Sequence, residues 1–308
     1  MARKRKGDPV HGWLVIDKPL NMSSAKAVYY AKNYLNAAKV GHGGTLDPMA
    51  SGVLPLAFGE ATKTLSYAVN KTKKYKFTIR WGEARDTDDL EGNIIGTSDE
   101  RPGVSAIQNI LKRFIGEVNQ VPPAYSAVKI SGQRAYKLAR AGNDVILKPR
   151  PVFIEDLTLM NILSTEEACF QLCCGKGVYV RSLARDLARA LGTVGCVSNL
   201  RRTQVGNFLE KDAISLDQLK ILGHKEAVAS KLLPVETVLD DIPALVLTEE
   251  EAKIVKNGIA IPLIQLAKSK QALRIGVATP FYTICQGKII SLAKIESGRV
   301  TPYRVLNL

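Results

Sequence analysis

The sequence predicts an α+β protein that ends in a small, mostly β module, and three observations support this prediction. Up to residue 243, short strand-like runs alternate with stretches of helical spacing. After Pro262 the remaining pattern consists of short strand-like runs. The length of 308 residues is sufficient for one large and one small domain. We therefore expect a larger domain over residues 1–243 and a β-rich domain over residues 244–308.

The N-terminal part begins with an apolar run and a helix. Residues 13–19 contain an apolar run that an Asp-Lys-Pro sequence ends. Ser23 or Ser24 can cap a helix that extends towards Leu35. A glycine-dense loop follows at residues 41–48.

The middle of the chain combines strands, helices and one basic excursion. Residues 74–81 alternate apolar and polar side chains, which predicts a half-buried strand. Residues 105–115 have helical spacing. Residues 122–151 are basic and lack a sustained apolar stripe, so we expect them to leave the core as an insertion. Residues 178–181 are predicted to end a strand, after which Ser182 leads into a helix.

The C-terminal module is predicted to contain one short helix and several strands. Thr248 and Glu251 form a capping box, with Thr248 as the N-cap and Glu251 at the third helical position. Gly258 supplies the C-terminal stop about two turns later. Four strand-like runs follow, at residues 273–278, 281–285, 289–295 and 300–305.

The chain is strongly basic, with 43 Lys and Arg against 29 Asp and Glu and a net charge of +14. Such an excess favours a polyanionic partner, above all a nucleic acid. Hydrophobic residues make up 46% of the chain, which excludes global disorder. No apolar run approaches the ~18 residues of a membrane span, and the basic start lacks the apolar stretch of a signal peptide. We therefore expect no membrane contact and a cytoplasmic location.

The sequence indicates neither a cofactor nor a metal. The five cysteines form no C-x-x-C pair and have no histidine at ligand spacing, so we expect small core residues in a reducing compartment. The glycine-dense loop lacks the third glycine of a dinucleotide fingerprint, and no G-x-x-x-x-G-K-S/T motif occurs. A serine triad is poorly supported, because the chain has three histidines and no G-x-S-x-G motif.

The glycine-dense loop carries one carboxylate in an unusual position, Asp47. The ring of Pro48 restricts Asp47 to extended or turn geometry. Such a segment can hold a carboxylate at a fixed angle while the glycines leave room for a bulky substrate. Asp-Pro is also a common turn, so a purely structural role stays open at this point.

The loop and its flanks are similar to a known family. Residues 40–55, VGHGGTLDPMASGVLP, resemble the signature of the TruB-type tRNA pseudouridine synthases, which isomerise the uridine at position 55 in the T loop of tRNA. Further motifs resemble those of the family in the same order: residues 14–19 with 23–24, 74–75, 122–136, 177–182 and 200–203. The C-terminal module lies where the family has a PUA-type RNA-binding domain, and its match is weaker.

The resemblance implies a fold, an activity and a partner. The fold would be the pseudouridine synthase fold, a mixed, largely antiparallel central sheet flanked by helices, followed by a PUA-like domain. The activity would be base flipping, Asp47-dependent cleavage of the glycosidic bond, and rejoining of the base through carbon. The partner would be tRNA, bound at its T arm by a monomer that uses no cofactor and no metal.

The resemblance assigns catalytic roles to Asp47, Tyr75 and Arg181. Asp47 would act as a nucleophile or as an electrostatic stabiliser. Arg181 would keep Asp47 ionised, because a guanidinium stays charged at any working pH. Tyr75 would stack on the uracil and help to remove the C5 proton. Asp89 matches a carboxylate that would hold Arg181 in turn.

The resemblance matches further residues to substrate binding. His42 would take the space that the flipped base leaves, and Tyr179 and Leu200 would line the uracil pocket. Lys18 belongs to a Lys-Pro pair that supports the catalytic loop. Phosphate contacts are expected from basic side chains of the insertion and of the segment at 71–76, namely Lys129, Arg134, Lys71, Lys73, Lys74 and Lys76.

Two other functions are compatible with parts of the sequence. The first is a tRNA-binding or RNA-folding module whose activity is secondary or lost. The second is a glycoside hydrolase that uses Asp86 and Asp88, in an acidic loop closed by Gly92, as paired carboxylates.

Overall fold

The computed structural model describes residues 7–222, 227–228, 230–266 and 279–308. Among these residues the largest sheet has ten strands, in the order β14-β1-β3-β12-β4-β11-β10-β7, with β2 beside β3 and β13 beside β12. The strands are β1 (Gly12–Lys18), β2 (Val40–His42), β3 (Ala50–Phe58), β4 (Lys73–Trp81), β7 (Gly116–Gln120), β10 (Arg150–Ile162), β11 (Glu167–Cys174), β12 (Gly195–Val205), β13 (Phe208–Leu209) and β14 (Ile214–Ser215). Neighbours are antiparallel except for the pairs β1–β14 and β3–β12. The predicted mixed, largely antiparallel sheet is confirmed.

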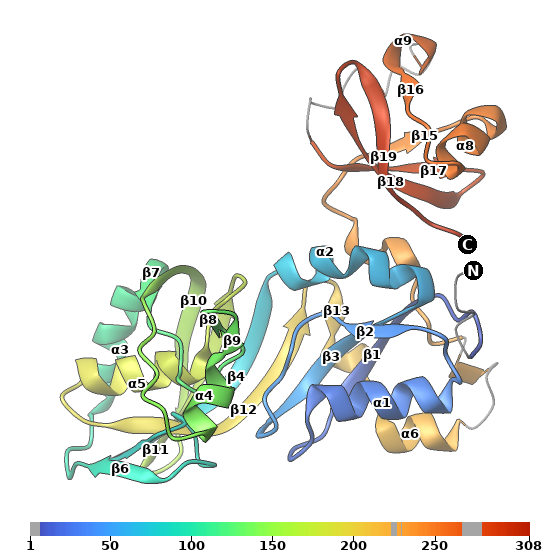
Figure 1. Cartoon of the computed structure of the whole chain (residues 1–308). Helices are drawn as coiled ribbons and strands as arrows, with labels where there is room; N and C mark the ends of the chain where they lie inside the picture. The colour runs from blue at the N-terminus through green and yellow to red at the C-terminus, as the bar shows by residue number, and fades with distance from the viewer. Residues whose placement is uncertain (1–6, 223–226, 229, 267–278) are drawn as a thin grey trace.

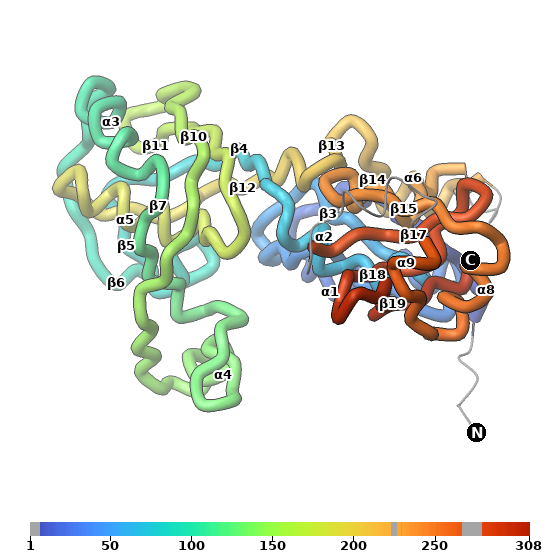
Figure 2. Tube along the Cα trace, turned by 90° about the horizontal axis from the view of Figure 1, so that it is seen from above, coloured from blue at the N-terminus to red at the C-terminus, as the bar shows by residue number. Residues whose placement is uncertain are grey.

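This sheet supports two lobes, and β4 and β12 run through both of them (Figures 1 and 2). The first lobe carries α1 (Ser24–Tyr34), α2 (Leu65–Asn70) and α6 (Leu216–Ile221), and the second carries α3 (Val104–Leu111) and α5 (Val180–Ala190). One cluster of buried apolar side chains extends from Leu14 through Phe77 to Leu187. Because the cluster spans both lobes, burial of one continuous apolar core holds them together.

Local sequence patterns explain the elements that flank the site. In β4, Tyr75 and Phe77 are buried whereas Lys74 is exposed, as the alternation predicts. Helix α1 begins after Ser23, whose side chain accepts a hydrogen bond from the backbone N–H of Lys26 at 3.2 Å. Ser23, not its neighbour, is therefore the N-cap. The helix predicted at 105–115 is α3 followed by a single 3₁₀ turn, Lys112–Phe114.

The strand predicted to end at residues 178–181 is wrong. β11 ends earlier, Gly177 turns the chain with φ +87°, and α5 begins directly after Tyr179. An alternation of four residues is too short to distinguish a strand from the first turn of an amphipathic helix. Arg181 still faces inward, because the first turn of α5 is buried against the sheet.

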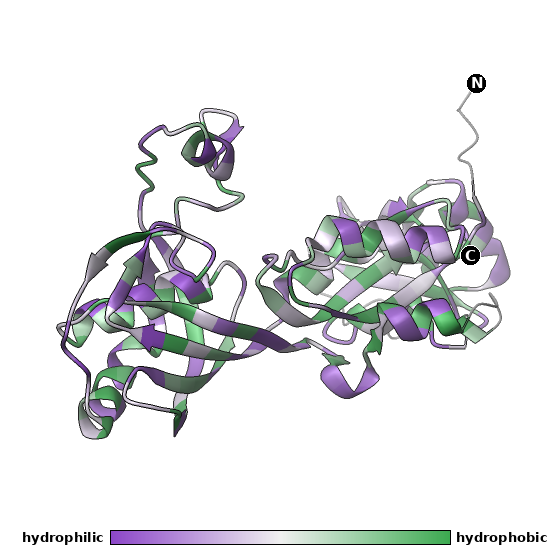
Figure 3. Ribbon diagram, turned by 90° about the horizontal axis from the view of Figure 1, so that it is seen from below, coloured by the Kyte–Doolittle hydropathy of each residue, from purple (hydrophilic) through white to green (hydrophobic). Residues whose placement is uncertain are grey.

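Residues 122–151 leave the body of the second lobe. They contain the hairpin β8 (Lys129–Ile130) and β9 (Gln133–Arg134) and the short helix α4 (Ala135–Arg140). Figures 2 and 3 show this segment, with α4, projecting from one side of the second lobe. A second hairpin, β5 (Glu83–Arg85) and β6 (Ile94–Thr97), frames the acidic loop.

The C-terminal module is built on a five-stranded sheet in the order β15-β17-β18-β19-β16. Its elements are β15 (Ala244–Val246), α8 (Glu249–Lys256), β16 (Ile261–Pro262), α9 (Leu263–Leu266), β17 (Phe281–Cys285), β18 (Lys288–Glu296) and β19 (Arg299–Val305). The predicted capping box is present at the start of α8. Three of the predicted strands are β17, β18 and β19, and the run at 273–278 lies outside the described residues.

The C-terminal module packs against the first lobe, above α2 in Figure 1. Leu292 and Leu306 share a buried cluster with Trp13 of β1. At its edge the hydroxyl groups of Tyr67 and Tyr303 are 2.6 Å apart and share a hydrogen bond. The contact is therefore an apolar core with a polar rim.

None of the helices in the described ranges is long and apolar enough to cross a membrane. The five cysteines are free thiols, and three of them, Cys173, Cys174 and Cys196, are buried. Burial raises the pKa of Cys174 to about 12, so this thiol stays protonated and unreactive.

Candidate active site

A cavity of about 660 Å³ lies where the two lobes meet. Its wall is formed by the glycine-dense loop, β4, the acidic loop, the insertion, and the turn before α5. Six of the residues predicted for the site line it: Asp47, Tyr75, Asp89, Tyr179, Arg181 and Leu200. These residues come from distant segments of the sequence, and the fold brings them together.

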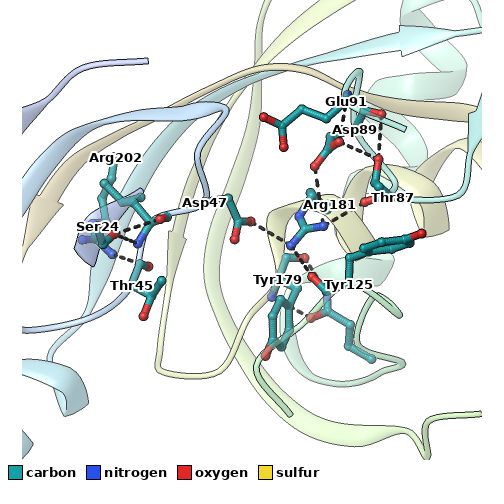
Figure 4. A network of polar contacts seen from close by, with 12 residues as sticks. Ser24, Thr45, Asp47, Thr87, Asp89, Glu91, Tyr125, Tyr179, Arg181 and Arg202 are labelled. Carbon is teal, nitrogen blue, oxygen red and sulfur yellow. Dashed lines mark hydrogen bonds and ion pairs between the residues drawn. The ribbon is translucent and has the colours of Figure 1, made fainter. Parts of the chain in front are cut away.

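The centre of the cavity wall is an ion pair between Asp47 and Arg181. Nη2 of Arg181 lies 2.9 Å from Oδ2 of Asp47, as Figure 4 shows. The Arg181 side chain is 5% exposed and that of Asp47 is 37% exposed. The guanidinium is therefore buried behind a carboxylate that remains open to the cavity.

Three further groups hold Arg181 in place. Nη1 donates to the carbonyl oxygen of Thr87 at 2.9 Å, and Nη2 donates to that of Tyr125 at 3.0 Å. Oδ2 of Asp89 lies 3.5 Å from Nη1. One buried guanidinium thus faces two carboxylates, which compensates for the loss of water around its charge.

Asp89 is itself fixed by the acidic loop. Its Oδ1 accepts hydrogen bonds from the Thr87 hydroxyl at 2.6 Å and from the backbone N–H of Glu91 at 3.0 Å. Burial raises the pKa of Asp89, and the bond from Thr87 and the charge of Arg181 act in the opposite direction. The loop therefore orients Asp89 towards Arg181 and away from solvent.

The segment that carries Asp47 is clamped on the helix side by Ser24. The Oγ atom of Ser24 accepts from the N–H of Leu46 and donates to the carbonyl oxygen of Leu46, both at 2.8 Å. Ser24 is 3% exposed. Because both backbone groups of the preceding residue are fixed, the backbone of Asp47 has little freedom at its N-terminal side.

A second clamp comes from Arg202 on β12, which is 1% exposed. Its guanidinium donates to the carbonyl oxygens of Gly44 at 3.0 Å, Thr45 at 3.4 Å and Val53 at 2.8 Å. Gly44 has φ +127°, a conformation that side chains rarely adopt, so this glycine is required for the loop to turn its carbonyl towards Arg202.

Lys18 holds the other end of the loop. Its Nζ donates to the carbonyl oxygens of Met22 at 2.6 Å, Pro19 at 2.9 Å and Pro48 at 3.3 Å. Lys18 is fully buried, and burial lowers its pKa to about 8 despite the opposing charge of Asp47. The side chain has no surface for RNA, so its place in the structure is that of a loop support.

The two tyrosines of the cavity are fixed in different ways. Tyr75 is 9% exposed, and burial raises its pKa, so its phenol is protonated at neutral pH. Tyr179 is held through its backbone by Gln120, whose Oε1 accepts from the N–H at 2.8 Å and whose Nε2 donates to the carbonyl oxygen at 3.1 Å. The ring of Tyr179 is therefore presented from a rigid turn.

His42 and the two basic residues of the insertion lie away from this centre. His42 ends β2, is half-buried, and does not line the cavity. Burial lowers its pKa, so the imidazole is neutral at pH 7. Lys129 and Arg134 face each other across the hairpin β8–β9 and are exposed. Arg134 donates to the carbonyl oxygen of Ala127 at 3.3 Å, and both exposed side chains are accessible to a polyanion that approaches the insertion.

Two of the lysines predicted to hold phosphates are engaged elsewhere, which corrects that prediction. Lys73 is 6% exposed, and its Nζ donates to the carbonyl oxygens of Val69 and Lys71. Lys71 pairs with Asp240, and its Nζ lies 3.0 Å from Oδ1 of Asp241. Lys74 and Lys76, on the other face of β4, are exposed as expected.

The acidic loop does not form a pair of catalytic carboxylates of the glycosidase type. Oδ1 of Asp86 accepts from the N–H of Asn93 at 3.0 Å. Asp88 pairs with Arg185 at 2.8 Å and does not line the cavity. Within the described ranges, no group of three His, Cys, Asp or Glu side chains is arranged to hold a metal ion.

Several supporting residues were not assigned a role in the site from the sequence. Ser24 and Arg202 lie inside recognised motifs, and only their burial beside the loop reveals what they bind. The carbonyl oxygens of Thr87 and Tyr125 and the side-chain amide of Gln120 act through contacts made across long sequence separations. No local pattern signals such contacts.

Solved structures share this fold. A chain of a Cbf5–Nop10–Gar1 complex has a TM-score of 0.72 and 23% identity, and the match covers 99% of this chain and 91% of that chain. A chain of an H/ACA ribonucleoprotein bound to a substrate RNA containing 2′-deoxyuridine has a TM-score of 0.71 and 21% identity, covering 100% and 92%. These likenesses show that the chain shares the fold of those chains, and the site adds a paired carboxylate and guanidinium in a cavity between two lobes.

Sequence comparisons identify the family of the chain. The model described as the N-terminal domain of TruB family pseudouridylate synthase matches residues 32–180, and that of the tRNA pseudouridylate synthase B C-terminal domain matches residues 181–240. A tRNA pseudouridine synthase B of Rhodospirillum rubrum is 51% identical over 308 residues, covering 100% of both chains. One of Bradyrhizobium diazoefficiens is 48% identical over 319 residues, covering 100% of this chain and 91% of that protein. The chain belongs to the TruB family of pseudouridine synthases.

Proposed function

We propose that this protein converts the uridine at position 55 in the T loop of tRNA to pseudouridine, as a monomer in the cytoplasm. The similar proteins of R. rubrum and B. diazoefficiens are named tRNA pseudouridine synthases. The observation that carries the proposal is the Asp47–Arg181 pair, a buried cation that keeps one carboxylate directed into a cavity of nucleotide size. Such a pair meets the main requirement of the reaction.

The reaction breaks the bond between N1 of uracil and C1′ of ribose, turns the base, and joins C5 to C1′. A proton leaves C5 and another is gained at N1, so the product is an isomer of the substrate. Asp47 supplies the carboxylate, which attacks the substrate or stabilises the charge that develops when the glycosidic bond breaks. Arg181 fixes the angle of this carboxylate and balances its charge.

The remaining cavity residues suit a flipped uracil. Tyr75 and Tyr179 offer rings for stacking, and Leu200 supplies an apolar surface from β12, the strand next to β4. A protonated Tyr75 positions a hydroxyl near C5 and does not act as a free phenolate. His42 would take the place that the base leaves in the T loop, since it lies at the start of the loop that carries Asp47.

RNA is gripped outside the cavity by the basic surface of the chain. Lys129 and Arg134 on the insertion, with Lys74 and Lys76 on β4, would contact phosphates of the T arm. We assign residues 1–243 to the catalytic domain and residues 244–308 to a PUA-like RNA-binding domain. Lys18 has a supporting role in this scheme and does not contact RNA.

The direct test uses a tRNA transcript labelled with tritium at C5 of uridine. The wild-type protein should release tritium from position 55, and a transcript with cytidine at that position should release none from that site. Asp47→Asn should lower the rate by at least about 10³-fold. Asp217→Asn, which changes an exposed carboxylate on α6, is the matched control and should behave as wild type. A wild-type protein without tritium release would refute the proposal.

The finer parts of the proposal are tested separately. An isolated T-arm stem-loop should be a substrate if recognition is confined to that arm. Light scattering of the free protein should give the mass of one chain. The alternative function, an RNA-binding module without activity, predicts no tritium release and normal tRNA binding. It is not favoured, because a binding module has no need of the fixed Asp47–Arg181 pair.

A further inference from the structure

The exposed side of α1 carries an unusual group of aromatic side chains. Tyr29 is 61% exposed and Tyr34 is 41% exposed. The ring of Tyr30 lies between them, 5.9 Å from that of Tyr29 and 6.3 Å from that of Tyr34. Nζ of Lys26 lies 5.9 Å from the centre of the Tyr30 ring. We call Lys26, Tyr29, Tyr30 and Tyr34 the tyrosine face.

The tyrosine face is not needed to hold α1 in the fold. The opposite side of the helix packs into the core through Ala27 and Ala31, which are fully buried. Of the ten tyrosines in the chain, three lie on this one helix. Large rings that remain in water at this density indicate a surface that another molecule covers.

The charge of α1 indicates what kind of molecule this is. The helix contains two lysines and no acidic residue, and the whole chain has a net charge of +14. Rings that stack and cations that meet phosphates are the combination with which proteins hold unpaired nucleotides. An acidic, base-bearing polymer fits this surface better than an apolar protein face does.

The tyrosine face lies on the helix that clamps the loop carrying Asp47. Helix α1 begins at Ser24, which is bonded to the residue before Asp47. Helices α1 and α6 pack side by side beneath the first lobe in Figure 1. Tyr136 and Arg140 of α4 line the cavity. Residues 26 to 34 span about 12 Å along the helix, enough for several nucleotides.

We propose that the tyrosine face is a second RNA contact, which binds a part of the substrate tRNA that does not enter the cavity. The rings of Tyr29 and Tyr34 stack on unpaired bases or on ribose, and Lys26 contacts a phosphate. This inference rests on the proposed function, because it takes the same RNA as the ligand.

The test measures binding of a tRNA transcript to the full-length protein at fixed salt. The double variant Tyr29→Ala, Tyr34→Ala should bind at least about 5-fold more weakly. The double variant Tyr29→Phe, Tyr34→Phe keeps both rings and should recover most of the affinity. Lys26→Ala should lower the slope of log affinity against log salt by about 1. Thermal melting of each variant checks that the fold is intact.

Ile221→Ala is the matched control, because Ile221 is an 82% exposed apolar side chain at the end of α6 and is not part of the tyrosine face. It should bind the transcript as wild type does. The inference is overturned if the double alanine variant binds as tightly as wild type, which would leave the face to a protein partner. It is also overturned if Ile221→Ala causes the same loss, or if the phenylalanine variant is as weak as the alanine variant. If wild type releases no tritium, the proposed function fails instead.

Discussion

Two adjacent serines, Ser23 and Ser24, support the same region in different ways. Ser23 caps α1 by accepting one hydrogen bond at 3.2 Å. Ser24 is buried and makes two hydrogen bonds of 2.8 Å to Leu46. Replacing each by alanine therefore separates the stability of the helix from the geometry of the Asp47 loop. We predict that only Ser24→Ala strongly impairs catalysis.

The expected magnitude follows from these contacts. Ser24→Ala removes two buried hydrogen bonds, each worth about 1 kcal/mol, and leaves an N–H and a carbonyl of Leu46 without this partner. The free energy of unfolding should fall by about 2–4 kcal/mol. Ser23→Ala removes a cap and should cost about 1 kcal/mol. Since a shift of ~1 Å in a reacting group can cost ~10²-fold in rate, kcat of Ser24→Ala should fall by about that factor.

The assay combines urea unfolding with tritium release at saturating RNA, at a temperature where every variant is folded. Ser23→Ala should then retain close to the wild-type kcat. Equal losses of kcat in the two variants would show that the effect comes from the helix and not from the loop. A wild-type kcat in Ser24→Ala would refute the idea that its contact with Leu46 positions Asp47.

Three further predictions concern other buried or bridging cations. Arg202→Lys keeps the charge but loses the guanidinium donors to three carbonyl oxygens. The free energy of unfolding should fall by about 3 kcal/mol, and kcat should fall with it. Wild-type values in urea unfolding and tritium release would contradict this prediction. In the folded protein the pKa of Lys18 is lowered from 10.5 to about 8. Between these two pH values the unfolded state binds more protons than the folded state does. The free energy of unfolding, compared with that of Lys18→Met, should therefore rise with pH, by up to about 1.4 kcal/mol per pH unit. Unfolding curves from pH 7 to 10 check the sign, and a fall would contradict it. Lys71→Met should lower the free energy of unfolding by at most about 1 kcal/mol, because the side chains of Asp240 and Asp241 are largely exposed. The difference from wild type should become smaller in 1 M salt. A larger loss of melting stability that does not depend on salt would contradict a surface ion pair.

Much of the fold is predictable because several elements carry local signals. The alternation in β4, the N-cap of α1 and the capping box of α8 each depend on residues within a few positions of one another. The order of the strands was not predicted, since β3 pairs with β12 about 150 residues away and no local pattern signals such a pairing. The error at residues 178–181 has the same origin: a four-residue pattern does not reveal which distant strand or helix it meets.

The site was predictable as a set of residues and not as a set of contacts. Asp47, Arg181 and Asp89 came from motif resemblance, and the structure adds their distances. The alternation of side chains along a strand could have corrected the prediction for one of the lysines. Lys73 lies two residues before Tyr75, so both side chains point to the same, buried face of β4.

Alternation along a strand does not by itself show which side chains are buried. Arg201 and Arg202 occupy opposite faces of β12, and the sequence does not state which face is buried. In the structure Arg201 pairs with Asp17 and Glu210 near the surface, while Arg202 is inside. Arg202 finds its hydrogen-bond acceptors inside, on the glycine-dense loop and on Val53 of β3.

The shared cluster between the C-terminal module and the first lobe affects how the chain folds during synthesis. Trp13 belongs to the first strand, and Leu306, from almost the other end of the sequence, belongs to the same buried cluster. A ribosome delivers the N-terminal residues first, at about 5–20 residues per second. The large sheet can therefore assemble while translation continues, but the part of this cluster that Ile289, Leu292 and Leu306 complete stays open until those residues have emerged. During that interval the nascent chain exposes a hydrophobic surface on which chaperones would act.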